Sequence, residues 1–450
     1  MSKSKSLDLT NGPILKTLAE LALPIMASSF LGTAYSITDM AWIGMLGSKA
    51  VAGAGVGSMY VWLSQGIASL PRMGGQVGVA QSCGKGDTET AGRFANASLQ
   101  VTLLLGILYA VLCVTLADPL LSIFNLPDSQ TYAAAKSYLM ITCGLIIFSF
   151  LNITLTGLST AQGDSKTPFK ANLAGLVMNM ILDPVLILGL GPFPRLETTG
   201  AAIATVLSQA LVLAALLIGI LRSKMENNVL KHLRLTALYP GYYYKHVFKI
   251  GFPTAVQGSL YCIISMVLTR MVSPFGPAAL ATQRVGGQIE SVSWNTADGF
   301  AAALNAFVGQ NYGAGKPDRI RKGYSVSFRL LTVWGLFITA AFVFFPRPIA
   351  SLFFHEADAL NIAVGYLMII GFSEAFMTIE LMTIGALSGL GRTNLCSGIS
   401  IVLTGARIPL ALLFTRIGLG LEGIWWALSL TSIVKGIIFY FTFRHISRKL

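Results

Sequence analysis

Apolar segments that are long enough to cross a membrane recur along the whole chain. A helix needs about 20 apolar residues to span the hydrocarbon core of a bilayer. Only 11% of the 450 residues are charged, whereas soluble domains carry about 25%. Twelve spans can be read between glycine, proline and charged residues, at about 15–46, 51–82, 91–117, 131–160, 168–190, 199–221, 247–272, 278–310, 321–345, 360–389, 394–415 and 421–443. The sequence therefore predicts an all-α integral membrane protein with twelve transmembrane helices.

Basic residues are divided unequally between the two sets of predicted loops. The loops that share a side with the termini carry 21 Lys and Arg residues, and the opposite loops carry five: Lys49, Lys136, Arg195, Arg347 and Arg416. Cytoplasmic loops are enriched in Lys and Arg. We therefore expect a multi-pass protein of the plasma (inner) membrane with both termini in the cytoplasm. This topology explains the net charge of +13 without any nucleic-acid partner.

The two halves of the chain are related by an internal repeat. The segment "LGSKAVAGAGVG" from Leu46 matches "FGPAALATQRVG" from Phe275, and "VAQSCGKG" from Val79 matches "VGQNYGAG" from Val308, both at a distance of 229 residues. Six spans in each half predict parallel repeats with a substrate path between them. We expect an N-lobe over 1–221, a basic cytoplasmic linker over 222–246 and a C-lobe over 247–450.

Two carboxylates and an amide lie inside predicted spans of the first half. Asp39 is in the middle of the first span, and Asn179 and Asp183 share one helix face of the fifth because they are four residues apart. A carboxylate at bilayer depth is costly and normally faces the bundle interior. By the repeat, Asp39 maps to Leu268 and Asp183 maps near Ile408. We interpret the acids as part of an asymmetric site for a cation or a proton.

Alternative interpretations stay open for several of these polar residues. Asp183 precedes Pro184, a pair that is also typical of a helix N-cap. Glu290, in the eighth span, fits either the lining of a cavity or a structural position. Three more acids of the second half fit a salt bridge or a helix interface as well as a functional role: Asp298, Glu374 and Glu380.

Methionines accompany the acids in the same predicted helices. Met178, Met180 and Met266 are flexible and polarizable, which suits an apolar cavity that accepts different substrates. Ordinary helix packing is the alternative interpretation for each of them.

Motifs for nucleotide hydrolysis, metal binding or hydrolytic catalysis are absent from the sequence. The segment "CGKGD" at Cys83–Asp87 lacks the Ser or Thr of a P-loop. The five cysteines are scattered with no CxxC, and the four histidines fall outside the apolar spans. We therefore expect no enzyme activity, no cofactor, no metal and no disulfide framework.

Taken together, these features resemble the multidrug and toxic compound extrusion (MATE) family over essentially the whole chain. The resemblance is carried by "LALPIM" from Leu21, "IGFPTA" from Ile250, "DMAWIGMLG" from Asp39, "VGQNYGAGK" from Val308 and "NMILDPVLILG" from Asn179. It implies a V-shaped bundle of two lobes. It also implies export of organic cations and amphiphiles in exchange for H+ or Na+ by alternating access.

The resemblance implies roles for particular residues. In the family, an Asp of the first helix and an Asn and an Asp of the fifth form a cation-responsive site, and these positions match Asp39, Asn179 and Asp183. Thr205, in "GAAIAT" of the sixth span, is implied as a further member. A glutamate in the pattern QRxxxxxE is implicated in some members, and Glu290 in "QRVGGQIE" matches it. Other members carry an acid in the seventh helix, which this chain lacks, and this argues against a sodium site in the C-lobe.

Three rival functions fit the sequence less well. A flippase of a lipid-linked precursor or other amphiphile shares the architecture, but we would expect it to have a more cationic central cavity. A channel requires more polar residues in each span, and a membrane enzyme requires a clustered catalytic set. We expect amphiphilic or cationic small-molecule substrates, a lipid bilayer as the surroundings, H+ or Na+ as the coupling ion, and a monomer.

Overall fold

Helices account for nearly all of the regular structure. The computed structural model describes residues 7–124, 126, 128–190, 193–223, 225, 228–354 and 356–450. These residues form helices and turns, with no strand among them, so the predicted all-α fold class is confirmed. Four residues discussed or counted above lie outside the described ranges: Lys3, Lys5, Lys224 and His355.

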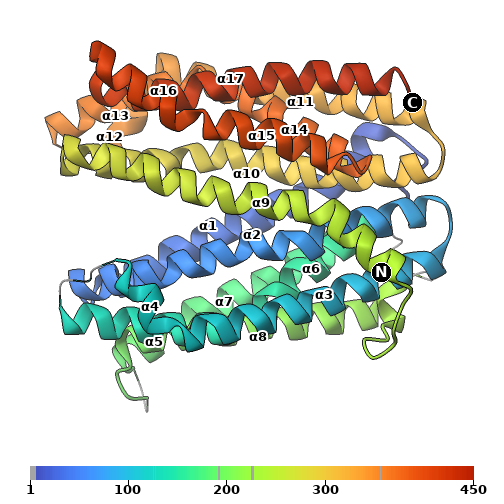
Figure 1. Ribbon diagram of the computed structural model, residues 1–450, viewed down its shortest axis with the longest axis horizontal. Coiled ribbons are helices and arrows are strands. Elements are labelled where there is room, and N and C mark those ends of the chain that lie inside the picture. Colours follow the sequence, from blue (N-terminus) through green and yellow to red (C-terminus); the bar gives the residue numbers. More distant parts are fainter. Residues whose placement is uncertain are drawn as a thin grey trace. The chain divides into compact units, whose positions relative to one another are not determined.

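The helices of the first half coincide with the first six predicted spans (Figure 1). The fourth span is a pair of helices, α5 and α6, bent by 47° at the break between them. The elements are α1 (Ile14–Gly44), α2 (Ser48–Gly84), α3 (Thr88–Thr115), α4 (Ala117–Ser122), α5 (Ser129–Gly144), α6 (Ile147–Ala161), α7 (Lys166–Leu188), α8 (Glu197–Arg222) and the short η1 (Val229–His232).

The second half repeats this order of elements. Corresponding helices have equal lengths: α2 and α10 each have 37 residues, α3 and α11 each have 28, and α4 and α12 each have six. α13 and α14 form a second bent pair, at 49°. The elements are α9 (Gly241–Val272), η2 (Ser273–Phe275), α10 (Pro277–Gly313), α11 (Pro317–Phe344), α12 (Pro346–Ser351), α13 (Ala357–Gly371), α14 (Glu374–Gly389), α15 (Thr393–Gly405), α16 (Arg407–Phe414), η3 (Thr415–Leu419) and α17 (Gly420–Ser447).

Length and composition show which helices can cross a membrane. In the described part of the chain, seven helical segments qualify, or up to nine if each bent pair is one span. One of the seven, Thr393–Ser447, contains the eleventh and twelfth predicted spans. The two remaining predicted spans coincide with α2 and α10, which are long but rich in glycine and polar residues. A helix therefore lies at the position of each of the twelve predicted spans.

The chain divides into two compact units whose boundaries cut α1 and α9. Unit 1 comprises Met1–Asp8 and Ala27–Gly258, and unit 2 comprises Leu9–Met26 and Ser259–Leu450. Pro24 of α1 and Pro253 of α9 lie near these boundaries. Proline removes an intrahelical hydrogen bond and favours a bend. The lobes expected at 1–221 and 247–450 stay a prediction, because the first parts of α1 and α9 are each grouped with the opposite half.

The helices of each unit lie side by side (Figure 1), and clusters of apolar side chains hold them together. In unit 1, one cluster joins α2, α3, α6, α7 and α8 with η1 and the start of α9. A second cluster joins α2, α3, α5 and α6 around the fully buried Phe150. In unit 2, Trp425 of α17 packs edge-on against Tyr366 of α13, with ring centroids 5.1 Å apart.

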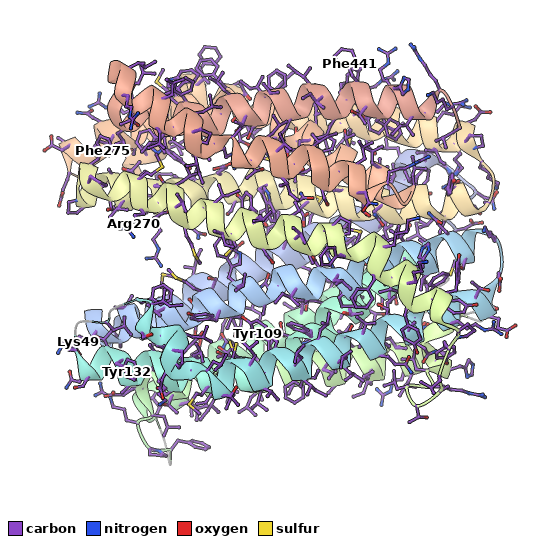
Figure 2. All side chains as sticks on the ribbon, viewed as in Figure 1. Lys49, Tyr109, Tyr132, Arg270, Phe275 and Phe441 are labelled. Carbon is purple, nitrogen blue, oxygen red and sulfur yellow. The ribbon has the colours of Figure 1, made fainter. Side chains whose placement is uncertain are left out.

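Polar side chains organise one end of unit 1. Figure 2 shows Lys49 and Tyr132 at this end, where Lys49 Nζ lies 3.1 Å from Gln130 Oε1 and 3.8 Å from Asp128 Oδ1. Asp128 caps α5, and the hydrogen bond from the backbone N–H of Thr131 holds the pKa of its carboxyl below the usual range. The start of α5 is therefore fixed beside the start of α2.

Side chains of α3 fix the described part of the linker between the halves. Gln100 Nε2 donates hydrogen bonds to the carbonyl oxygens of Leu235 and Ala237, at 2.7 and 2.8 Å. Asn96 Oδ1 accepts a hydrogen bond from the backbone N–H of Arg234 at 2.7 Å. These bonds attach the chain that leads into α9 to unit 1, which explains why the start of α9 belongs to that unit.

Candidate cation site

Nine buried side-chain oxygens of unit 1 have no hydrogen-bond partner among the described residues. Five of the nine lie near one another: the Tyr35 hydroxyl, Asp39 Oδ1, Asn179 Oδ1, Asp183 Oδ2 and Thr205 Oγ1. They belong to one cluster, because Asp39 lies within electrostatic range of Asp183 and Tyr35 lies within range of both acids. A buried polar atom without a partner is costly, and native proteins contain few of them. Five such oxygens in one place indicate a site shaped for a cation or for protons.

Helix α7 supplies two of the five oxygens from adjacent turns. Asn179 and Asp183 are fully buried, and Asn179 Nδ2 donates a hydrogen bond to Asp183 Oδ1 at 3.0 Å. The helix continues through Asp183 to Leu188, so Asp183 does not cap a separate half-helix. Pro184 has no N–H, which leaves the carbonyl oxygen of Met180 without its intrahelical partner. This stretch of α7 is therefore rich in oxygen atoms that can accept a hydrogen bond or bind a cation.

Two tyrosines that were not predicted from the sequence, Tyr35 and Tyr138, complete the cluster. Tyr35 precedes Asp39 by one helical turn on α1, so the two side chains share a face. Thr205 of α8 lies close to the hydroxyls of Tyr35 and Tyr138 but forms no hydrogen bond of regular geometry with either. Gly57 of α2 makes room for Tyr138, since a Cβ at this glycine would lie 2.9 Å from Tyr138 Cδ1. The spacing of Tyr35 from Asp39 was the signal in the sequence that could have identified it.

The corresponding place in unit 2 is apolar. Leu268, which maps to Asp39, is 2% exposed and packs in a cluster with Ile264, Val272 and Ile408. Ile408 is the residue that maps near Asp183. Hydrocarbon side chains thus fill the position where unit 1 carries two acids, and the cluster of acceptors has no counterpart there.

Unit 2 places a different acid beside the repeated tyrosine. Tyr366 begins the segment "YLMI", which repeats the "YLMI" from Tyr138 at a distance of 228 residues. Its hydroxyl donates a hydrogen bond to Glu290 Oε2 at 3.3 Å. Gly286 lies one turn before Glu290, and a Cβ there would be 2.3 Å from Tyr366 Cε1. The same glycine–tyrosine contact therefore occurs in both units, while the acid comes from α1 and α7 in one and from α10 in the other.

The three acids left open by the sequence have different surroundings. Glu380 forms a buried ion pair with Lys435, with Oε1 and Nζ 2.7 Å apart. Glu374 is 1% exposed, and neither of its carboxylate oxygens has a hydrogen-bond partner among the described residues. It lies within electrostatic range of Glu290. Asp298 has an interaction partner. Glu380 thus belongs to a structural ion pair, whereas Glu374, for which the sequence left both interpretations open, forms no ion pair among the described residues.

The methionines expected in a substrate cavity occupy separate positions. Met178 lines an apolar groove on α7 together with Val177 and Ile181, and Met180 is 47% exposed. Met266 lies in the part of α9 that belongs to unit 2. The cavity role of the three stays a prediction.

Comparison with known proteins identifies the family. The family model MatE matches residues 24–185 and 253–413. The chain belongs to the MATE family. The two matched stretches begin at Pro24 and Pro253, which are 229 residues apart like the repeat found in the sequence. The protein is therefore a multi-pass membrane transporter built from two copies of the family repeat.

Two curated relatives cover nearly the whole chain. The probable multidrug resistance protein NorM of Thermotoga maritima is 28% identical over 440 residues, which are 96% of this chain and 91% of that protein. The FAD transporter of Shewanella oneidensis is 26% identical over 441 residues, 96% of this chain and 95% of that protein. The relatives thus carry names that refer to two different kinds of substrate.

Solved structures of the family share the fold. A MOP superfamily transporter from Pyrococcus furiosus aligns with a TM-score of 0.90 at 21% identity, over 100% of this chain and 99% of that one. The outward-facing conformation of a multidrug resistance MATE family transporter aligns with the same TM-score, identity and coverage. At these identities, the agreement concerns the fold alone.

Proposed function

We propose that this transporter exports amphiphilic or cationic small molecules in exchange for H+ or Na+ by alternating access. The observation that carries the proposal is the cluster of five partnerless oxygens on α1, α7 and α8 of unit 1. We further propose that it acts as a monomer, without a cofactor or enzyme activity, in the plasma (inner) membrane with both termini cytoplasmic. The basic loops on the side of the termini support this orientation.

The chemistry of the cluster suits a hard cation or a proton. All five atoms are oxygens, and hard cations prefer carboxylate, carbonyl and hydroxyl oxygen ligands. A proton would serve equally well, because a protonated carboxyl becomes a donor to one of the neighbouring acceptors. Two ionised carboxylates near one another in a buried place repel, so one added positive charge lowers the energy of the site. Asp39 and Asp183 are the groups that would change charge.

Helix α1 offers a path by which ion binding reaches the rest of the transporter. It carries Tyr35 and Asp39 in unit 1, whereas its residues up to Met26 belong to unit 2. A change in how α1 packs against α7 therefore acts on a helix that is part of both units. Coupling of this kind is reciprocal: the ion weakens substrate binding by the factor with which substrate weakens ion binding. A membrane potential contributes about 2.3 kcal/mol per charge per 100 mV.

An anionic substrate is the second candidate, because one relative is named an FAD transporter. Such a substrate requires cations that are free to bind it. Of the two cations that are buried in the described part of unit 2, Lys435 pairs with Glu380, whereas Arg407 donates to the neutral hydroxyls of Thr431 and Ser432, each at 3.0 Å, and keeps its charge. The two buried acids of the cation site, Asp39 and Asp183, favour the cationic class of substrate over an anion or a lipid-linked pyrophosphate.

Transport by purified protein in lipid vesicles tests the proposal. Export of a fluorescent organic cation is measured with only a pH gradient, or only a sodium gradient, across the vesicle membrane, and FAD is the comparison substrate. We expect Asp183→Asn to reduce gradient-driven export by about tenfold or more, because the neutral side chain no longer changes charge. Asp358→Asn, at an exposed acid of α13, is the matched control and leaves export unchanged. Undiminished export by Asp183→Asn would refute the assignment.

A further inference from the structure

An apolar groove lies along α7 and α8 of unit 1, and none of the residues that line it belongs to the cation site. The groove has a volume of about 420 Å3. Leu173, Val177 and Ile181 line it at successive turns of α7 and are 39%, 50% and 57% exposed. Lys170 is the single charged residue among the described residues that line it. The groove is therefore an open apolar surface whose lining includes one basic residue, Lys170.

Further cations surround the end of the groove at Lys170. A Cβ at Gly219 would lie 2.5 Å from Thr167 Cγ2, so the end of α8 packs against the start of α7. This contact brings Arg222 to the same end as Lys166 and Lys170. All three are exposed and have no ion pair within the part of the chain that the structure describes.

Among the described residues, basic side chains outnumber acids at this end. Lys231 Nζ donates a hydrogen bond to the carbonyl of Ser223, which adds a fourth cation next to Arg222. The acid nearest to Lys166 in the sequence, Asp164, accepts a hydrogen bond from the backbone N–H of Thr167 at 3.0 Å, in the first turn of α7.

We propose that this groove is a binding site for an anionic phospholipid. An acyl chain lies along the apolar side chains of α7, and the phosphate of the headgroup binds Lys170 with support from Lys166 and Arg222. Basic pockets between transmembrane helices bind anionic headgroups, and each Lys or Arg near the headgroup changes binding by about fivefold. A lysine at the end of a helix extends its stem along apolar surface while its ammonium group reaches the headgroup region.

Unit 2 carries a matched groove without the lysine. Its volume is about 450 Å3, and it lies between α15 and α17. When Pro184 is matched to Pro409, Lys170 corresponds to Leu395 and Val177 corresponds to Val402, and both of these residues line the second groove. The nearest basic residue in the sequence, Arg392, precedes α15 and does not line it. The chain thus provides a neutral control for its own basic groove.

Native mass spectrometry of the purified full chain tests the site. The affinities for phosphatidylglycerol and phosphatidylcholine with identical acyl chains are compared in the absence of any gradient. We expect the wild-type protein to bind phosphatidylglycerol more tightly than phosphatidylcholine. In Lys170→Leu, the ratio of the two affinities is expected to be about fivefold smaller. Lys322→Leu, at an exposed lysine of α11, removes the same charge elsewhere and keeps the preference. Leu395→Lys is expected to bind a second molecule of phosphatidylglycerol tightly.

Three outcomes overturn the proposal. In the first, Lys170→Leu keeps the preference for phosphatidylglycerol and Leu395→Lys binds no additional phosphatidylglycerol. In the second, Lys322→Leu loses as much of the preference as Lys170→Leu does, which indicates an effect of general surface charge only. The third is displacement of the lipid by excess glycerol 3-phosphate, which indicates a site for free phosphate. Thermal unfolding in detergent shows that each variant is folded. Asp183→Asn is expected to keep the preference for phosphatidylglycerol. The proposal of a lipid site and the proposal of ion exchange can therefore be refuted independently of one another.

Discussion

At the scale of single residues, a glycine fixes the tyrosine at each polar site. Gly57 allows Tyr138 to approach α2, and Gly286 allows Tyr366 to approach α10. The repeat has kept this contact in both units, but it has not kept the acid that accompanies it. The tyrosine is therefore part of the common architecture, and the position of the carboxylate distinguishes the two units.

The first prediction concerns the space at Gly57. In Gly57→Ala the added Cβ lies 2.9 Å from Tyr138 Cδ1, so the ring must move. Overpacking of this kind costs about 1–3 kcal/mol in the free energy of unfolding. Gly55→Ala is the control, because a Cβ there meets nothing within 4 Å, and alanine gains about 0.5–1 kcal/mol over glycine inside a helix. Thermal unfolding in detergent measures both variants, and equal melting temperatures would contradict the prediction.

At the scale of helices, one buried ion pair joins α14 to α17. Glu380 and Lys435 are 7% and 6% exposed at their side chains, so solvent screens their attraction only weakly. The second carboxylate oxygen of Glu380 has no hydrogen-bond partner among the described residues. Removing a charge from water is costly, and the gain from pairing repays this cost only in part. The net contribution of the pair to stability is therefore expected to be small, although removal of one partner alone is costly.

The second prediction follows from this balance. Lys435→Met leaves Glu380 buried without a counter-charge and should lower the free energy of unfolding by about 3–5 kcal/mol. The double variant Glu380→Leu with Lys435→Met should recover most of the loss, since two apolar side chains replace the two charges. Denaturation in detergent compares the three proteins. A double variant as unstable as the single one would show that the loss does not come from an uncompensated charge on Glu380 and would contradict the prediction.

At the scale of the whole molecule, the distribution of basic residues sets the proposed orientation. Five of the 26 Lys and Arg residues assigned to loops and termini lie on the side opposite the termini. The side of the termini, which carries most of the basic residues, includes the end of the lipid groove at Lys170 and the linker near Arg234. Both the anionic-lipid site and the linker are therefore expected on the cytoplasmic face.

The third prediction tests this orientation directly. Green fluorescent protein fused after Leu450 should fluoresce in bacterial cells, because it folds in the cytoplasm. Alkaline phosphatase fused after residue 190, in the loop between α7 and α8, should be active, because it folds outside. The reversed pattern, with a dark C-terminal fusion and an inactive loop fusion, would invert the topology and place the termini outside.

The sequence by itself determined the membrane-spanning all-α fold, the repeat and the pairing of Asn179 with Asp183. Each of these depends on local information: the length of an apolar run, the distance between similar segments, and residues four apart on one helix. The helix bounds of the structure follow the predicted spans for this reason.

Only the tertiary structure decided which polar atoms meet across helices. Tyr138 joins Thr205 from another helix, Glu380 pairs with Lys435 at a distance of 55 residues, and α1 is divided between two units. No periodicity encodes such contacts, since they depend on how helices far apart in sequence pack against one another. The same packing left five neighbouring oxygens without partners, and this observation, rather than the presence of an acid in an apolar span, is what marks the candidate cation site.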